Sequence, residues 1–114
     1  MAQMRITDGK GVQFEFDNGV TVSIQIGRGN YGDNYNWPGG WENPTRKNPL
    51  PWSTKAEVAV WGRDGQWFDL NNDQVAGYVP VQDVLTFMEY LRCLPDNVSA
   101  KSVQIDASIL DRKL

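Results

Sequence analysis

The side chains of this sequence best suited to binding a ligand are aromatic rings and arginines. The aromatic residues outside the expected core are Tyr31, Tyr35, Trp37, Trp41, Trp52, Trp61 and Trp67. The basic residues able to meet a phosphate are Arg28, Arg46, Lys47, Arg63 and Arg92. An aromatic face can stack on a nucleobase, which contributes about 1 to 3 kcal/mol, and a guanidinium can pair with phosphate oxygens. These residue types therefore suggest a nucleotide-binding site.

The same residues allow two plainer interpretations. The aromatic rings could fold back over the outer face of a sheet and pack on Trp61 and Trp67 as a second small core. They could also form a subunit interface, where Trp and Tyr are enriched. Each basic residue could be an ordinary solvated surface charge. Of the arginines, only Arg28 and Arg46 belong to the long loop over residues 27–54, which carries most of the rings.

Few side chains of this chain could act in catalysis. It contains no His, which excludes a Ser-His or Cys-His nucleophile pair, an H-E-x-x-H zinc site and an imidazole base. An enzyme would have to use carboxylates, Tyr or Lys, and Asp33 and Glu42 are examples of such carboxylates. The single cysteine, Cys93, cannot form an internal disulfide and is expected to be a small buried residue. We expect a binding protein that is not an enzyme and has no metal or cofactor.

A glycine-rich segment follows directly after a predicted strand. It reads Gly27-Arg28-Gly29-Asn30-Tyr31-Gly32, which satisfies the G-x-G-x-x-G spacing of dinucleotide-binding folds. That fingerprint also needs a helix to begin at the glycines, whereas residues 33–40 are rich in Asn, Pro and Gly. Either the loop only ends a strand, or its backbone N–H groups converge on an anion with Arg28 adding charge. Arg28, Asn30 and Tyr31 are candidate ligand-binding residues.

The elements that must position these residues begin with a hairpin over residues 11–26. Apolar and polar residues alternate on both sides of the turn at Asp17-Asn18-Gly19. A two-residue loop would mix apolar and polar side chains on one face. A three-residue loop with Gly19 in the left-handed conformation pairs Phe16 with Val20, and one face is then wholly apolar. The further pairs of this register are Phe14 with Val22 and Val12 with Ile24.

A second hairpin is expected over residues 56–70, around Arg63-Asp64-Gly65. A three-residue loop pairs Val60 with Phe68 and Val58 with Leu70 on the core face. The same register sets Trp61 opposite Trp67 on the other face. Two tryptophans away from the core are candidates for stacking on a ligand.

A helix should follow, with Pro80 in its first turn and Pro95 after its end. Its apolar positions are Val81, Val84, Leu85, Met88 and Leu91. Its solvent side is expected to carry Asp83, Thr86, Glu89 and Arg92. Residues 102–106 alternate like a short strand, and residues 106–114 could form a helical turn. The predicted fold is α+β: an antiparallel sheet built from two hairpins, with a C-terminal helix packed on one face.

Length and charge limit the remaining possibilities. With 114 residues the chain suits one domain, 1–114, whose sites are shallow or shared between subunits. A net charge of −3 argues against general nucleic-acid binding. No apolar run approaches the roughly 20 residues that span a bilayer, and residues 1–10 lack the apolar core of a signal peptide. We expect a cytoplasmic protein without a membrane partner.

Two segments resemble a family of small phage-encoded proteins. They are G-V-Q-F-E-F-D-N-G-V-T-V-S-I-Q-I-G-R-G-N-Y at residues 11–31 and A-E-V-A-V-W-G-R-D-G-Q-W at residues 56–67. They are similar to the type 1 Thoeris anti-defence proteins, and the resemblance runs from about residue 11 to residue 92. It implies a sheet-plus-helix multimer in the infected bacterial host. It also implies a pocket in which an aromatic ring stacks on adenine and arginines hold phosphates.

The function implied by this resemblance is sequestration, without degradation, of a cyclic ADP-ribose immune signal made by a TIR-domain enzyme. Some members are thought to hold cyclic oligonucleotides at separate sites. The candidate ligand residues, taken from the residue types above, are Arg28, Asn30, Tyr31, Arg46, Trp61, Trp67 and Arg92. The alternatives are a phage inhibitor that binds a host defence protein directly, as an anti-CRISPR does, and a nucleotide-cleaving enzyme.

Overall fold

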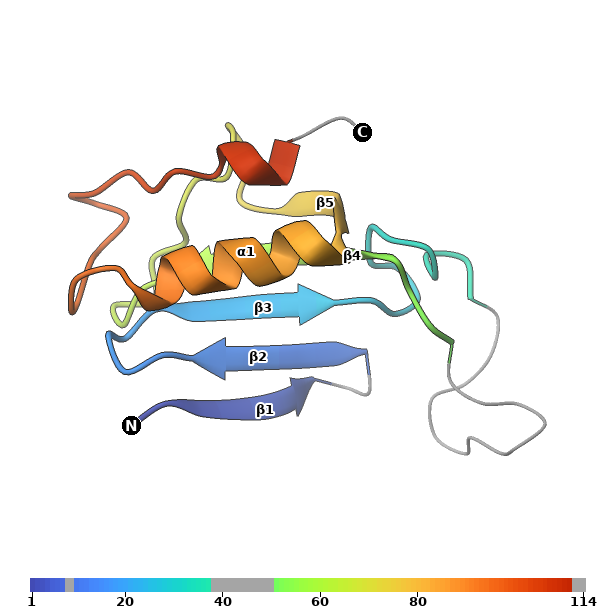
Figure 1. Cartoon of the computed structure of the whole chain (residues 1–114), viewed down its shortest axis with the longest axis horizontal. Coiled ribbons are helices and arrows are strands. Elements are labelled where there is room, and N and C mark those ends of the chain that lie inside the picture. The colour runs from blue at the N-terminus through green and yellow to red at the C-terminus, as the bar shows by residue number, and fades with distance from the viewer. Residues whose placement is uncertain (8–9, 38–50, 112–114) are drawn as a thin grey trace.

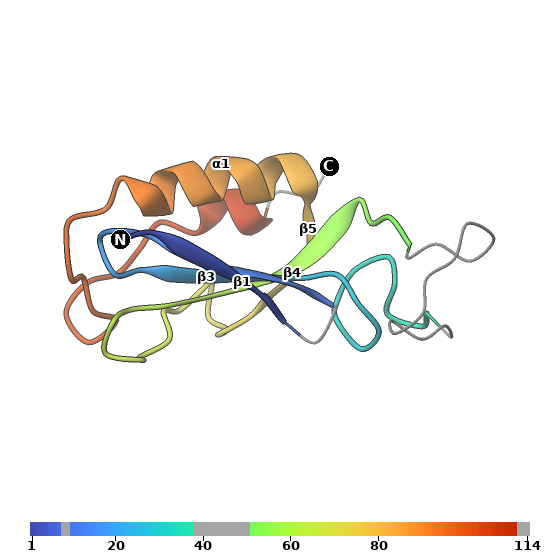
Figure 2. The same ribbon diagram turned by 90° about the horizontal axis from the view of Figure 1, so that it is seen from below.

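The fold is one antiparallel sheet with a helix across one face (Figures 1 and 2). The computed structural model describes residues 1–7, 10–37 and 51–111. Its elements are β1 (Gln3–Thr7), β2 (Gly11–Glu15), β3 (Thr21–Gln25), β4 (Lys55–Trp61), β5 (Ala76–Pro80), α1 (Val81–Arg92) and the 3-10 helix η1 (Ser108–Asp111). The strands lie in the order β1-β2-β3-β4-β5. The predicted α+β class, with a helix on one face of an antiparallel sheet, is confirmed.

The first hairpin has the predicted register. Phe16 N–H donates to Val20 O at 2.8 Å, and Phe14 lies opposite Val22. Gly19 has φ +90°, the left-handed conformation that closes a three-residue loop without steric cost. The apolar face of this hairpin turns toward α1, and its polar face forms the other side of the sheet.

The second hairpin is formed only next to its turn. Trp61 pairs with Trp67, and Phe68 N–H donates to Val60 O at 2.8 Å, as expected. The predicted pairing of Val58 with Leu70 is wrong, because Val58 lies opposite Ala76 of β5. Two left-handed asparagines at residues 71 and 72, with φ 58° and 72°, turn the chain away after Leu70. Short polar side chains tolerate this conformation best among non-glycine residues.

The core lies between the sheet and α1. From the sheet it takes Val20, Val22, Ala56, Val58, Val60 and Val79, and from the segment after β4 it takes Phe68 and Leu70. The helix adds Val84, Phe87 and Leu91, and the C-terminal segment adds Ile105, Ala107 and Leu110. Each fully buried Val, Leu or Phe contributes about 1.5 to 3 kcal/mol relative to exposure. The sheet is therefore anchored most firmly at β3, β4 and β5.

The helix departs from its predicted faces at several residues. Val81 and Leu85 were expected on the apolar side but are 41% and 60% exposed, whereas Phe87 is buried. Asp83 was expected in solvent but is buried, with 2% of its surface exposed. It is the third residue of α1, where a carboxylate lies close to the free N–H groups and the positive end of the helix dipole. Cys93 was expected to be buried but is exposed, because the helix ends there and Leu91 supplies the inward side chain.

The C-terminal segment also differs in part from its prediction. Residues 102–106 form no strand; the segment is held by Asp106 N–H, which donates to Tyr90 Oη at 2.8 Å. The helical turn expected in residues 106–114 is present as η1. Strands β1 and β5 were not predicted. Within residues 1–7, 10–37 and 51–111, no helix is long and apolar enough to cross a bilayer.

Candidate binding pocket on the outer sheet face

The face of the sheet opposite α1 carries a row of polar side chains and one tryptophan. Strand alternation places Gln3, Arg5, Gln13, Glu15, Thr21 and Trp61 on this face. Gln3 lies opposite Glu15, and Arg5 lies opposite Gln13. Thr21 is paired with Trp61 across β3 and β4. Four neighbouring strands therefore contribute to one surface.

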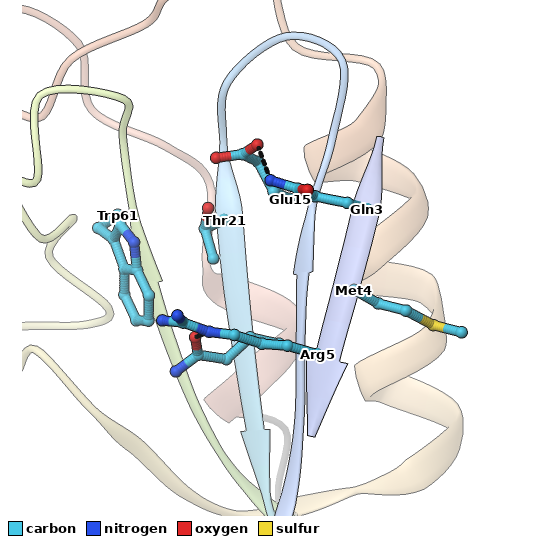
Figure 3. Close-up of a pocket in the computed structure, with 7 residues that line it drawn as sticks. Gln3, Met4, Arg5, Glu15, Thr21 and Trp61 are labelled. Atoms are coloured by element: carbon cyan, nitrogen blue, oxygen red, sulfur yellow. Dashed lines mark hydrogen bonds between the residues drawn. The ribbon is translucent and has the colours of Figure 1, made fainter. Parts of the chain in front are cut away.

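These residues line an open cavity of about 340 Å³ (Figure 3). Arg5 Nε donates to Gln13 Oε1 at 2.7 Å, so the arginine lies along the sheet and extends toward Trp61. Gln3 Nε2 donates to Glu15 Oε1 at 3.0 Å at the other end. Met4 belongs to the lining through its strand, but its side chain points away from the cavity. The cavity combines an indole, a guanidinium, two amides and a carboxylate.

Trp61 is supported from behind by Trp67. Their ring centroids lie 5.2 Å apart with 24° between the planes, and Trp67 remains 43% exposed. The prediction that these two tryptophans face each other away from the core is confirmed by their pairing. A stacked partner restricts the rotation of Trp61, so the orientation of the indole ring beside the cavity is held by Trp67.

Arg28, Asn30 and Tyr31 lie at the opposite end of β3 and β4. At one end of these strands Thr21 lies opposite Trp61, and at the other end Gln25 lies opposite Glu57. Trp61 and Glu57 are four residues, or about 14 Å, apart along β4. There Tyr31 N–H donates to Glu57 Oε2 at 2.9 Å, and Asn30 Nδ2 donates to Glu57 Oε1 at 3.4 Å. The structure therefore divides the predicted site residues into two groups.

Tyr31 is the middle ring of an exposed tyrosine group. Its centroid lies 5.8 Å from Tyr35 and 5.9 Å from Tyr78. Gly77 allows this packing, because a Cβ there would come within 2.7 Å of Tyr31 Cβ. The three rings are 46%, 41% and 54% exposed in the order Tyr31, Tyr35, Tyr78. They form a second aromatic surface, separate from the cavity.

The glycine-rich loop uses its own backbone donors. Gly29 N–H donates to Tyr35 O at 3.0 Å, Asn30 N–H donates to Gly27 O at 3.1 Å, and Tyr31 N–H reaches the Glu57 carboxylate. A carboxylate of the chain itself therefore takes the position that an anion would occupy at Tyr31. Arg28 is exposed beside this loop.

The rest of the loop is anchored to the start of β4. Asp33 Oδ2 accepts hydrogen bonds from Thr54 N–H and Thr54 Oγ1, both at 2.7 Å. These bonds lower the pKa of Asp33 below its usual value. A carboxylate held in its ionised form is a poor general acid, so Asp33 serves the loop better as an anchor than as a proton donor.

The two remaining candidates lie elsewhere. Arg92 is at the end of α1, where Arg92 Nη2 lies 2.6 Å from Glu89 Oε1, and this contact raises the pKa of the arginine and lowers that of the glutamate. It therefore joins neither aromatic group. Arg46 lies outside the described residues.

Sequence reasoning missed the polar half of the cavity. Gln13 and Glu15 occupy the predicted polar face of the first hairpin, the face that Trp61 also shares once β3 pairs with β4. The alternation of Gln3, Met4, Arg5, Ile6 and Thr7 is the signal that could have found β1. Extending the alternation by one strand would have identified Arg5.

The fold and the site define a small sheet-plus-helix protein with an aromatic and cationic cavity on its open sheet face. In the part of the chain that the structure describes, no three Cys, Asp or Glu side chains gather as a metal-binding group. Comparison of the chain with protein-family models, with curated proteins and with solved structures gives no match. The functional argument therefore rests on the residues of the cavity.

Proposed function

We propose that this protein binds and sequesters a small nucleotide signal of the cyclic ADP-ribose type without degrading it. The observation that carries the proposal is the cavity in which Trp61, backed by Trp67, faces the same space as Arg5. An adenine ring and a phosphate are the parts of such a ligand that an indole and a guanidinium recognise.

The other residues of the cavity suit the rest of a nucleotide. Glu15 accepts hydrogen bonds and can receive ribose hydroxyls, while the amides of Gln3 and Gln13 can donate and accept. A volume of about 340 Å³ lies within the range of small-molecule sites, roughly 300 to 1,000 Å³. The cavity is open to solvent on one side, so part of a dinucleotide-sized ligand would extend beyond it.

Binding without chemistry agrees with the available side chains. The sequence has no His, and Glu15, the carboxylate of the cavity, accepts a hydrogen bond from Gln3 instead of facing a nucleophile. A sequestering protein needs affinity and slow release, both of which follow from stacking the base and pairing the phosphate.

Mass spectrometry after ligand release tests this function directly. Purified protein is incubated with cyclic ADP-ribose isomers, freed of unbound ligand and denatured by heat, and the supernatant is analysed. Recovery of one intact isomer supports the proposal, and its loss in a Trp61→Ala variant assigns it to the cavity. All isomers intact in the wash and absent from the released fraction would contradict sequestration of these signals, and degraded ligand would indicate an enzyme.

A second candidate function is inhibition of a host defence protein through direct binding. The exposed group of Tyr31, Tyr35 and Tyr78 favours it, since tyrosine is enriched at the centres of protein interfaces. A rise in melting temperature with nucleotide alone supports the first function. Co-purification of a host protein that Tyr31→Ala abolishes supports the second.

A further inference from the structure

Strand β1 forms one edge of the sheet, and its outward backbone groups can be assigned. The bonds of β2 show which groups these are. Phe16 N–H donates to Val20 O and Ile26 N–H donates to Lys10 O, so the even-numbered residues of β2 bond toward β3. Its odd-numbered residues therefore bond toward β1, where they meet Gln3, Arg5 and Thr7. The N–H and C=O groups of Met4 and Ile6 consequently point away from the sheet.

This edge has little of the usual protection against pairing. Natural edge strands are protected by shortness, charged side chains, prolines or bulges. Here β1 keeps a continuous register with β2, contains no Pro, and has Arg5 as its single charged residue. Arg5 lies back over the sheet, bonded to Gln13. Met4 and Ile6, on the helix side of the strand, are 70% and 80% exposed.

We propose that two copies of the chain join β1 to β1 in an antiparallel pair whose two-fold axis passes through Met4. The two sheets of five strands then become one sheet of ten strands. The inference goes beyond the proposed function, and the edge strand carries it without reference to any ligand.

The register between the two β1 strands follows from the face that Met4 and Ile6 occupy and from the charge of Arg5. In the dimer, the outward N–H and C=O groups of one β1 strand bond to those of the other. If Met4 and Ile6 of both copies also lie on the same face of the joined sheet, the two-fold axis can pass through Met4, Arg5 or Ile6. An axis at Arg5 brings two arginines directly opposite each other, where like charges destabilise a pair. Among the described residues 1–7, an axis at Ile6 overlaps only residues 5–7 of each copy, whereas an axis at Met4 overlaps all of residues 1–7.

The axis at Met4 makes the edge complementary to itself. Gln3 lies opposite the partner's Arg5, and Met4 lies opposite the partner's Met4. On the helix side the exposed Met4 and Ile6 gain apolar neighbours beside the half-buried Val12 and Phe14. The joined strands are short, so the buried area is below the roughly 800 Å² per partner of standard interfaces, and the dimer should be reversible.

The cavities on the other face stay separate in this dimer. In this register the two Arg5 residues become diagonal neighbours across the axis, about 7 to 8 Å apart at their Cβ atoms. Each Arg5 side chain lies back over its own sheet, bonded to Gln13, so the two guanidinium groups point away from each other.

Sedimentation velocity over a range of protein concentrations, without nucleotide, tests the interface. We expect reversible dimers that Met4→Pro abolishes, because Pro removes the outward N–H but leaves the bonds from Arg5 to β2 intact. Met4→Lys, which sets two charges opposite each other, should act the same way. The control Val103→Lys, at an exposed apolar residue outside the sheet, should leave the dimer unchanged.

Cysteine cross-linking tests the register in a Cys93→Ser background. Met4→Cys should form a disulfide-linked dimer, since residues opposite each other in a bonded pair lie about 5.5 Å apart between Cα atoms, within disulfide range. Arg5→Cys and Ile6→Cys should not cross-link to themselves. A monomer at all concentrations, dimers insensitive to both Met4 variants, or self-linking at Arg5→Cys would each overturn the proposal. None of these outcomes depends on nucleotide binding.

Discussion

Asn18 Nδ2 donates a hydrogen bond of 2.9 Å to the backbone oxygen of Leu91, joining the first hairpin turn to the end of α1. The same amide donates to Leu94 O at 3.0 Å, and its Oδ1 accepts from Val20 N–H at 3.0 Å. Carbonyls at a helix C-terminus have no partner within the helix. Asn18, which is 5% exposed, therefore caps α1 from a distant part of the chain.

Replacing Asn18 should destabilise the whole fold. Asn18→Ala removes the side-chain donor from Leu94 O and from Leu91 O, which keeps only Leu94 N–H, and it leaves the buried Val20 N–H without its acceptor. Together these losses cost about 2 to 3 kcal/mol. For a chain of this size that corresponds to a fall of about 8 to 12 °C in melting temperature. Thermal unfolding followed by circular dichroism measures it. Asp17→Ala, one residue earlier and exposed, is the matched control, and an equal shift in the two variants would contradict the capping role.

Removal of the stacking ring should weaken nucleotide binding. Trp61→Ala takes away the indole of the cavity, with an expected loss of about 5- to 150-fold in affinity, equivalent to 1 to 3 kcal/mol. Trp67→Ala should cause a smaller loss, because that ring supports Trp61 from behind. Calorimetric titration measures both, and an unchanged far-UV spectrum shows that the fold persists. Tyr31→Ala, in the separate tyrosine group, should bind nucleotide normally. Weaker binding in Tyr31→Ala with unchanged binding in Trp61→Ala would place the site at the tyrosine group instead.

Arg5 should provide the phosphate contact of the cavity. Arg5→Gln removes a charged donor, for which about 1.5 to 3 kcal/mol is typical, or about 10- to 150-fold in dissociation constant. The remaining affinity should also depend less on salt concentration, since fewer charges interact. The control is Arg28→Gln, which removes the same charge beside the glycine-rich loop. Loss of binding in the control alone would place the phosphate at that loop.

The fold was predictable where local patterns determine it. The alternation of apolar and polar residues, with a left-handed Gly19, predicted the register of the first hairpin. The helical spacing of Val84 and Leu91, with the flanking prolines, predicted the position of the helix. Pairing of Val58 with Ala76 could not be read in this way. It depends on Asn71 and Asn72 turning the chain away and on a polar contact from Asn71 Nδ2 to Ala107 O at 2.9 Å, far along the sequence.

The candidate site was predictable only in its aromatic half. Trp61 and Trp67 stood out because a hairpin register placed two large rings away from the core. Arg5 and Gln13 did not stand out, since a polar residue on an outer strand face is common and gains meaning only from the strand beside it. The role of Asn18 was equally hidden, because a turn asparagine is typical of hairpins whether or not it caps a helix.

Acid should release the anchor between Asp33 and Thr54. Hydrogen bonds from Thr54 lower the pKa of Asp33 below its usual value of 3.8, so the folded state favours the ionised carboxylate. A depressed folded-state pKa stabilises the protein above the unfolded value and loses that contribution as pH falls through the folded-state pKa. Asp33→Ala should therefore melt at a lower temperature than the unmodified protein at neutral pH, and the difference should shrink as pH falls below 3.8.

Melting curves across this pH range measure the difference in melting temperature, with Asp96→Ala as the control for loss of an exposed carboxylate. A difference that does not depend on pH would mean that the two hydrogen bonds do not stabilise the loop.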